Sequence, residues 1–187
     1  LVTGAITIAA KRNFGASHST SEYLAFIDSD AYPEEEWLHR AIDILSKDRR
    51  IGAVGGPNIS PPVETSSERF VGCALKSVLV TGLGNFRKTI SPRRIVKDLP
   101  SCNLVVRRAE FLSIGGMNEM LFTGEDIDYC RRMVRSGRKI VYDPAVLVYH
   151  KNRNLKAFAG QRLTFGSGVF SLLREGISIP SLMLLFP

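Results

Sequence analysis

The chain has 187 residues, of which 44% are hydrophobic and 23% are charged, so it is long enough for one globular domain with a real core. Its net charge of +7 at pH 7 favours an anionic partner, such as a nucleotide diphosphate, a nucleic acid or an acidic membrane surface. The odd number and wide spacing of Cys73, Cys102 and Cys130 argue against a disulfide framework or a zinc ribbon and suit a reducing compartment.

The first predicted element is a helix over residues 6–19, which carries the basic pair Lys11 and Arg12 followed by Asn13. Because the helix precedes a predicted strand closely, Lys11 or Arg12 would lie near phosphates at the edge of a sheet. The alternative is a solvated helix end with Gly15 as a stop signal.

Residues 23–27 form an apolar run that leads directly into Asp28 and Asp30. The run predicts a strand buried on both faces, as in parallel sheets, with the acids at the edge where such sheets bind ligands. Two carboxylates this close repel each other unless a cation lies between them, and Mg²⁺ is usually held by one or two carboxylates plus substrate phosphates. The alternative is an acidic turn that caps the next helix.

Pro33 and the glutamates at 34–36 predict the start of a helix, which continues to residue 45 with apolar residues at helical spacing. Residues 51–57 resemble a buried strand that ends at Gly and Pro. A strand, a helix and a strand in succession predict a right-handed parallel crossover. The expected fold class is therefore α/β, with a mostly parallel sheet flanked by helices.

A helix is expected over residues 68–83, followed by a segment that Gly and Pro interrupt and that is rich in basic residues. This segment is either a mobile flap over an anionic substrate or a solvated surface. Its basic residues are Arg87, Lys88, Arg93, Arg94 and Lys97.

In the second half, residues 101–106 predict a strand, residues 107–114 a short helix, and residues 139–143 and 146–149 two further strands. Glu125, Asp126 and Asp128 open another helix. Acids are favourable in the first turn of a helix, but three within four residues exceed what capping requires. His150 follows the last strand; a histidine at such a position is more often hydrogen-bonded than a metal ligand.

The order of these motifs resembles that of the family 2 glycosyltransferases of GT-A fold, over about residues 8–170. The motifs are Arg12-Asn13-x-Gly15, Asp28-Ser29-Asp30, Asn103 before Arg107-Arg108, Gly115-Gly116-x-Asn118-Glu119, Gly124-Glu125-Asp126-x-Asp128 and His150.

This resemblance implies inverting transfer of a sugar from a nucleotide-sugar, such as a UDP-sugar, to a hydroxyl of a lipid-linked sugar or polysaccharide. It implies that Asp30 and His150, and less directly Asp28, bind Mg²⁺ or Mn²⁺. Asp126 is the expected general base, with Glu125 beside it contacting acceptor or sugar. The other expected substrate-binding residues are Lys11, Arg12, Asn13, Asn103, Gln161 and Arg162. The complete Gln-x-x-Arg-Trp motif of processive members is absent, so the resemblance does not extend to processive synthesis.

Family members open with a strand, a Pro-x-Tyr-Asn-Glu-like turn and a second strand whose final aspartate reads the base. No such residues precede Leu1. We therefore expect residues 1–168 to be a partial GT-A domain that lacks its first β-α-β portion and binds nucleotide poorly alone. The apolar residues 169–187 are expected to form an interfacial helix or the start of a membrane segment. With the basic surface, they predict a place on the cytoplasmic face of the cell membrane.

Three other readings are weaker. A nucleotidyltransferase shares the metal-diphosphate chemistry, but its diagnostic Gly-rich loop would follow a first strand that lies upstream. A nucleic-acid-binding module suits the charge, yet aromatic residues make up only 9% of the chain, with no evident stacking platform, so no nucleic-acid partner is expected. A catalytically inactive membrane scaffold would not need Asp30, Asp126 and His150.

Overall fold

The computed structural model describes residue 4 and residues 7–77 and 81–161. Arg162 and the predicted apolar tail, 169–187, lie outside the described residues. In chain order the elements are α1 (Ile8–His18), β1 (Tyr23–Ile27), β2 (Ala31–Pro33), α2 (Trp37–Lys47), β3 (Ile51–Gly55), β4 (Asn58–Ile59), α3 (Ser66–Lys76), a 3₁₀ helix η1 (Gly82–Arg87), β5 (Arg94–Val96), β6 (Asn103–Arg107), α5 (Arg108–Ser113), α6 (Glu125–Arg135), β7 (Lys139–Tyr142) and β8 (Val148–His150). Residues 155–161 are also helical.

The main sheet of the described chain has five strands in the order β1-β6-β3-β7-β5. Strand β6 is antiparallel to both neighbours, β5 is antiparallel to β7, and β3 is parallel to β7. Strands β1, β3 and β7 therefore run in the same direction. Of these three, only β3 and β7 are direct neighbours, and every other pair of neighbouring strands in this sheet is antiparallel. The predicted α/β class is confirmed, and the expectation of mostly parallel pairing is wrong because β6 inserts between β1 and β3.

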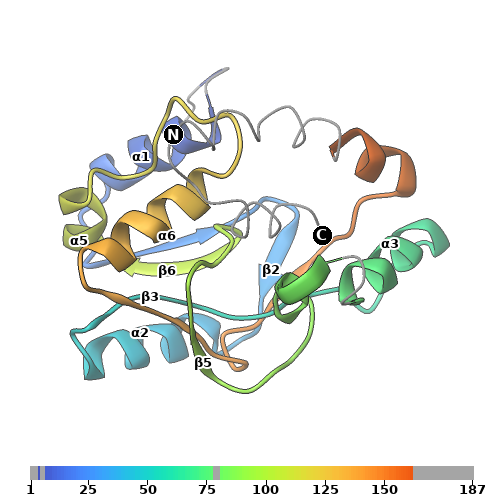
Figure 1. Ribbon diagram of the computed structural model, residues 1–187, viewed down its shortest axis with the longest axis horizontal. Helices are drawn as coiled ribbons and strands as arrows, with labels where there is room; N and C mark the ends of the chain where they lie inside the picture. Colours follow the sequence, from blue (N-terminus) through green and yellow to red (C-terminus); the bar gives the residue numbers. More distant parts are fainter. Residues whose placement is uncertain (1–3, 5–6, 78–80, 162–187) are drawn as a thin grey trace.

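The sheet has a hydrophobic core on each face, as the alternation of side chains along its strands requires. Leu104 and Val106 of β6 pack with α1, α5 and α6, whereas Val105 faces the core formed with α2. Figure 1 shows α1, α5 and α6 on one side of the sheet and α2 on the other. This layering explains why β3 and β6 are buried along their whole length.

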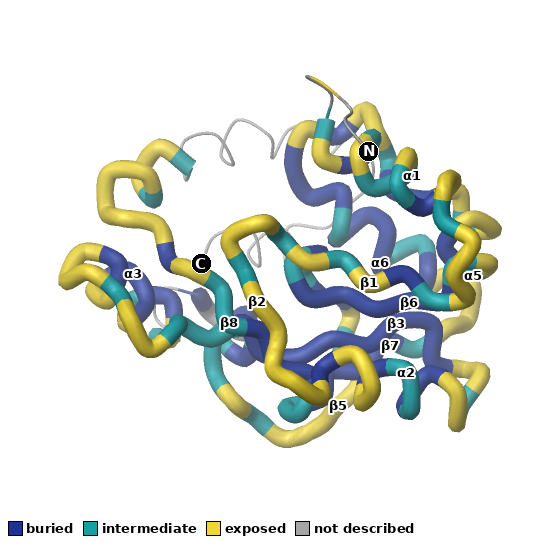
Figure 2. The backbone as a smooth tube through the Cα atoms, turned by 180° about the vertical axis from the view of Figure 1, so that it is seen from behind, coloured by how far each residue is buried: buried dark blue, intermediate teal, exposed yellow. Residues whose placement is uncertain are grey.

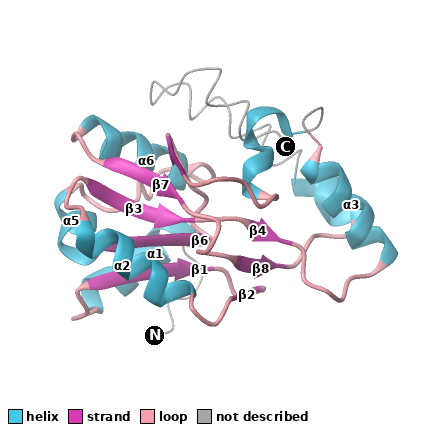
Figure 3. Cartoon of the chain, turned by 90° about the horizontal axis from the view of Figure 1, so that it is seen from below, coloured by secondary structure: helices cyan, strands magenta, loops and turns pink. Residues whose placement is uncertain are grey.

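Each of the three strands that run in one direction continues into a small second sheet of order β2-β8-β4. Strand β1 leads to β2, β3 leads to β4, and β7 leads to β8, so the second sheet extends the first at a single edge (Figure 3). The turns that connect a strand of the first sheet to a strand of the second lie at the seam between the sheets. Asp28 and Asp30 belong to the turn between β1 and β2. This edge is the carboxyl end of the parallel strands, where α/β folds bind ligands.

Strand β1 forms as predicted, but it is not buried on both faces. It lies at the end of the described sheet and pairs there only with β6, and part of it is exposed (Figure 2). The exposed residues are Ala25 and Ile27. An apolar run also suits a strand with one covered face and one open edge.

One local prediction is wrong for a reason that lies far away in the sequence. Pro33 does not open a helix; it ends β2, which pairs with β8, and α2 begins only at Trp37. Helix α1 passes through Gly15 and continues to His18, within the predicted range of 6–19. Within the basic segment, residues Arg94–Val96 form edge strand β5, and Arg94 Cζ lies 4.5 Å from the centroid of the Phe86 ring.

None of the described helices is long and apolar enough to cross a membrane.

Candidate functional site

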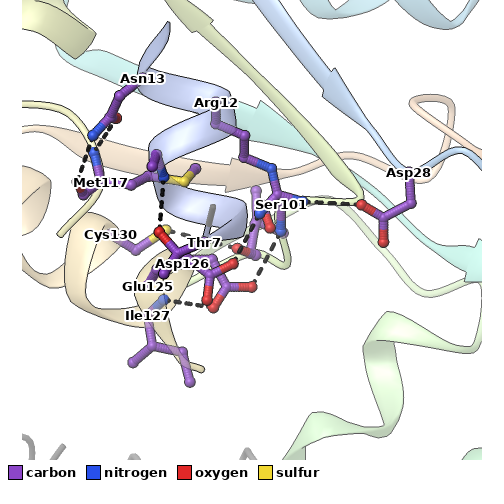
Figure 4. Close-up of polar contacts among 12 residues, drawn as sticks. Thr7, Arg12, Asn13, Asp28, Ser101, Met117, Glu125, Asp126, Ile127 and Cys130 are labelled. Atoms are coloured by element: carbon purple, nitrogen blue, oxygen red, sulfur yellow. Dashed lines mark hydrogen bonds and ion pairs between the residues drawn. The ribbon is translucent and has the colours of Figure 1, made fainter. Parts of the chain in front are cut away.

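Arg12 connects the two groups of acids that the sequence places far apart. From the second turn of α1, its Nη1 donates to Glu125 Oε1 at 2.8 Å and its Nη2 donates to Asp28 Oδ1 at 2.9 Å. Figure 4 shows the guanidinium between these carboxylates, with Asp126 beside Glu125. The Arg12 and Glu125 side chains are only 13% and 11% exposed. The predicted acids therefore converge in one site.

The seam between the sheets brings Asp28, Asp30 and His150 together. Ala31 of β2 pairs with His150 of β8, which places the histidine beside the turn that carries both aspartates. His150 Nε2 lies 3.5 Å from Asp28 Oδ2 and 3.5 Å from Asp30 Oδ1. Hydrogen bonding to His150, and then the charge of Arg12, hold the pKa of Asp28 below its ordinary value. Asp28 is thus an ionised acceptor near neutral pH.

Glu125 and Asp126 open α6, where Gly124 supplies the left-handed N-cap with φ of 77°. Asp126 accepts hydrogen bonds from the backbone N–H of Ser101 at 3.2 Å and of Ile127 at 2.8 Å. Burial raises the pKa of Asp126, and burial with the charge of Asp126 raises that of Glu125. A held carboxylate with a raised pKa is a stronger base than an exposed aspartate, which suits proton abstraction.

The groups around His150 fit a divalent cation. Asp28 Oδ1 is engaged by Arg12, but its Oδ2 faces His150. The Asp30 side chain is 49% exposed, and His150 Nε2 lies 3.5 Å from its Oδ1. Carboxylate oxygens and one imidazole are suitable ligands for Mn²⁺, while Mg²⁺ would rely mainly on the oxygens.

Asn103, predicted to bind substrate, is instead part of the scaffold. It is fully buried; its Oδ1 accepts from Trp37 Nε1 at 2.8 Å and its Nδ2 donates to Val146 O at 2.8 Å. These bonds tie β6 to α2 and to the loop before β8, and they leave no polar group directed toward a ligand. This correction has a simple cause: a buried amide must satisfy its polar groups locally.

The structure gives Asn13 a supporting role, and its predicted substrate contact stays a prediction. Its Nδ2 donates to Met117 O and to Glu119 Oε1, each at 2.8 Å, and its Oδ1 accepts from Met117 N at 2.8 Å. The preceding Gly115 and Gly116 have φ of 88° and 64°, which favours glycine. Asn13 therefore fixes the loop that leads to Glu125.

The remaining predicted residues lie at the periphery. Lys11 is exposed on α1, next to Arg12 but without its two carboxylate contacts. Gln161 is half-buried at the end of the described helix over 155–161. Arg162 lies outside the described residues.

Two residues of the site were missed by the sequence reasoning, and both precede Asn103. Ser101 offers the backbone N–H that holds Asp126. Cys102 lies close to Asp28 and His150, with one ligand atom of each within 4.8 Å of the others. The position of Cys102 follows from the strand pairing. Ile27 pairs with Asn103, so Asp28 and Cys102, which are the next residues outward in the ladder, face each other.

A cavity of about 590 Å³ lies at the opposite edge of the main sheet and is not this site. Its arginines serve the fold: Arg107 Nη1 donates to Ile51 O at 2.6 Å, and Arg138 Nη1 donates to Arg49 O at 2.8 Å.

Comparison with known proteins agrees with this geometry. The model of the family described as "Glycosyl transferase family 2" matches residues 7–111. The pre-mycofactocin glycosyltransferase of Mycobacterium tuberculosis is 31% identical over 165 residues, which cover 88% of this chain and 34% of that protein. The glucosyl-dolichyl phosphate glucuronosyltransferase of Haloferax volcanii is 25% identical over 195 residues, covering 96% of this chain and 57% of that protein.

Among solved structures, the mannosyltransferase PcManGT from Pyrobaculum calidifontis, in complex with GDP-Man and Mn²⁺, has a TM-score of 0.60 at 17% identity. The similarity covers 94% of this chain and 46% of that chain. It supports the GT-A fold. The chain spans between about a third and three fifths of the length of these relatives.

Proposed function

Because the chain belongs to glycosyltransferase family 2, we propose that it carries the metal-binding and general-base groups for metal-dependent, inverting transfer of a sugar from a nucleotide-sugar to an acceptor hydroxyl. The observation that carries this proposal is the double contact of Arg12, which binds Asp28 on one side and Glu125 on the other. One site then holds both the carboxylates for a cation and a carboxylate base.

On the donor side, Asp28, Asp30 and His150 would hold Mg²⁺ or Mn²⁺ on the diphosphate. The cation would neutralise the charge that develops on the leaving diphosphate, without a proton transfer. Arg12 keeps Asp28 Oδ1 occupied, so Oδ2 is directed toward His150. The mannosyltransferase structure contains GDP-Man and Mn²⁺, which supports this arrangement by analogy. For this chain we still expect a UDP-sugar.

On the acceptor side, Asp126 takes the proton of the incoming hydroxyl. The N–H groups of Ser101 and Ile127 hold its two oxygens, and each oxygen keeps a second lone pair for the acceptor. A base placed across the sugar from the leaving diphosphate favours in-line attack, which inverts the anomeric carbon. General-base catalysis of this kind typically contributes ~10²–10⁴-fold in rate.

We further propose a lipid-linked sugar or a surface polysaccharide as the acceptor, at the cytoplasmic face of the cell membrane. The net charge of +7 favours an anionic surface. The name of the Haloferax relative includes glucosyl-dolichyl phosphate, which agrees with a lipid-linked class of acceptor.

The test uses the whole protein that contains this chain. It is incubated with Mn²⁺, a panel of nucleotide-sugars and a lipid-linked sugar acceptor, and the release of nucleoside diphosphate and the anomeric configuration of the product are measured. We expect inversion, loss of transfer with EDTA and loss of transfer in Asp30→Asn. The matched control is Asp43→Asn, because Asp43 pairs with Lys47 on the surface of α2. Transfer that survives both EDTA and Asp30→Asn would contradict the metal role.

A further inference from the structure

We propose that Asp28, Cys102 and His150 form a site for a thiophilic divalent cation such as Zn²⁺, which competes with Mg²⁺ or Mn²⁺ and stops sugar transfer. The proposal rests on the proposed function for its inhibitory consequence, but not for the binding itself. One ligand atom from each of the three residues lies within 4.8 Å of the other two. The sulfur distinguishes this group from an ordinary carboxylate site.

The sheets bring the three residues together. In the ladder between β1 and β6, Ile27 pairs with Asn103, so the next residues outward, Asp28 and Cys102, face each other. In the second sheet, Ala31 pairs with His150, which brings the imidazole to the same turn. Three separate strand ends thus fix the three backbones, and only side-chain rotation remains for binding.

The spacing suits a small tetrahedral cation. With Zn–N near 2.0 Å and Zn–S near 2.3 Å, neighbouring ligand atoms lie about 3.5 Å apart. His150 Nε2 and Asp28 Oδ2 are already 3.5 Å apart. The other separations in the group, each at most 4.8 Å, would shorten to about 3.5 Å on binding. A fourth position stays open for water, as in other three-ligand zinc sites.

The available atoms agree with this assignment. Arg12 occupies Asp28 Oδ1 and leaves Oδ2 for a cation. His150 Nε2 lies 3.5 Å from that oxygen. Cys102 is a free, half-buried cysteine. On binding, its thiol releases one proton to solvent and ligates as the thiolate.

The chemistry of the ligands decides between cations. Mg²⁺ requires near-octahedral oxygen ligands and keeps several waters, whereas Zn²⁺ and Co²⁺ accept imidazole and thiolate. A cation bound to sulfur would be drawn toward Cys102 and away from the exposed Asp30. It would then occupy the place of the diphosphate-bound metal without presenting the same open positions to the donor.

The experiment titrates the whole protein with Co²⁺ and records its absorption spectrum. We expect a thiolate-to-cobalt charge-transfer band in the near ultraviolet. The band persists in Cys73→Ser, whose cysteine is exposed on α3, and in Cys130→Ala, whose buried thiol donates to Leu99 O at 3.8 Å. It disappears in Cys102→Ser and Cys102→Ala. Absence of the band in the wild type, or its survival in the two Cys102 variants, overturns the proposal.

A second measurement determines Zn²⁺ affinity by competition with a chromophoric chelator. Loss of a direct ligand should weaken binding by at least the ~10–100-fold typical of losing an outer-shell partner, so Cys102→Ser binds Zn²⁺ correspondingly less tightly than Cys73→Ser does. Equal affinities would overturn the assignment of Cys102 as a ligand. Neither readout needs an active transferase, so failure of the proposed function would leave both results interpretable.

The final arm measures inhibition. In the Mn²⁺-supported transfer assay, we expect Zn²⁺ to inhibit the wild type and Cys73→Ser equally. A higher Zn²⁺ concentration is needed to inhibit the transfer activity that Cys102→Ser retains. Equal inhibition of all three proteins would overturn the competitive role.

Discussion

The Arg12 guanidinium lies 2.8 Å from the Glu125 carboxylate, although 113 positions separate the two residues in the sequence. The contact joins α1 to the start of α6 across the edge of the sheet. Since the same guanidinium also binds Asp28, it sets the distance between the proposed cation site and the proposed base. The fold thereby turns two distant acidic motifs into one site.

Arg12→Met should destabilise the protein. Removing one partner of a mostly buried ion pair leaves an uncompensated charge, which costs about 3 kcal/mol or more. The loss should be smaller in acid, because Glu125, whose pKa is raised by burial, is then protonated and needs no partner. Urea unfolding at acidic and at neutral pH measures the effect, with Lys11→Met as the exposed control from the same helix. Equal stability of the two variants would contradict the anchoring role.

The pH dependence of stability should carry the signature of Glu125. Burial, and then the charge of Asp126, raise the pKa of Glu125 from 4.5 to about 7. A carboxyl whose pKa is higher in the folded chain binds its proton more tightly there, so its stabilisation is complete below the unfolded pKa and is lost as the pH rises through about 7. We expect Glu125→Gln to lose less unfolding free energy than the wild type over this range.

Denaturant unfolding at a series of pH values tests this expectation. The control is Glu35→Gln, since Glu35 is exposed. Parallel profiles for Glu125→Gln and the wild type would contradict it.

Asn103→Leu should affect folding rather than substrate binding. It leaves Trp37 Nε1 and Val146 O without their hydrogen-bond partner. Each buried polar group left unpaired costs about 1–3 kcal/mol of stability. We expect a lower urea midpoint, with transfer per folded molecule unchanged. Unchanged stability combined with lost transfer would show that Asn103 contacts substrate after all.

The sequence predicts those parts of the site that follow from local pattern. Asp28 and Asp30 follow an apolar strand, Glu125 and Asp126 open an amphipathic helix, and His150 ends a strand. Each is visible within a short window of sequence. The fold class also follows from the alternation of strand and helix patterns.

What the sequence does not reveal depends on partners far along the chain. Pro33 has the local signature of a helix start, but pairing with Val148 of β8 draws it into a strand. Asn103 adjoins the site in sequence, yet its side-chain amide is hydrogen-bonded to Trp37 and Val146. The closeness of Cys102 to Asp28 depends on strand register, which no local pattern specifies.

The most direct test of the central claim, that Asp126 is the base of a site whose cation lies on the other side of Arg12, is Asp126→Asn in the whole protein. The initial rate of sugar transfer and the binding of the nucleotide-sugar with Mn²⁺ are measured on the same preparation. We predict that kcat falls by ~10²–10⁴-fold while donor affinity is unchanged. Turnover equal to that of the wild type would contradict the account.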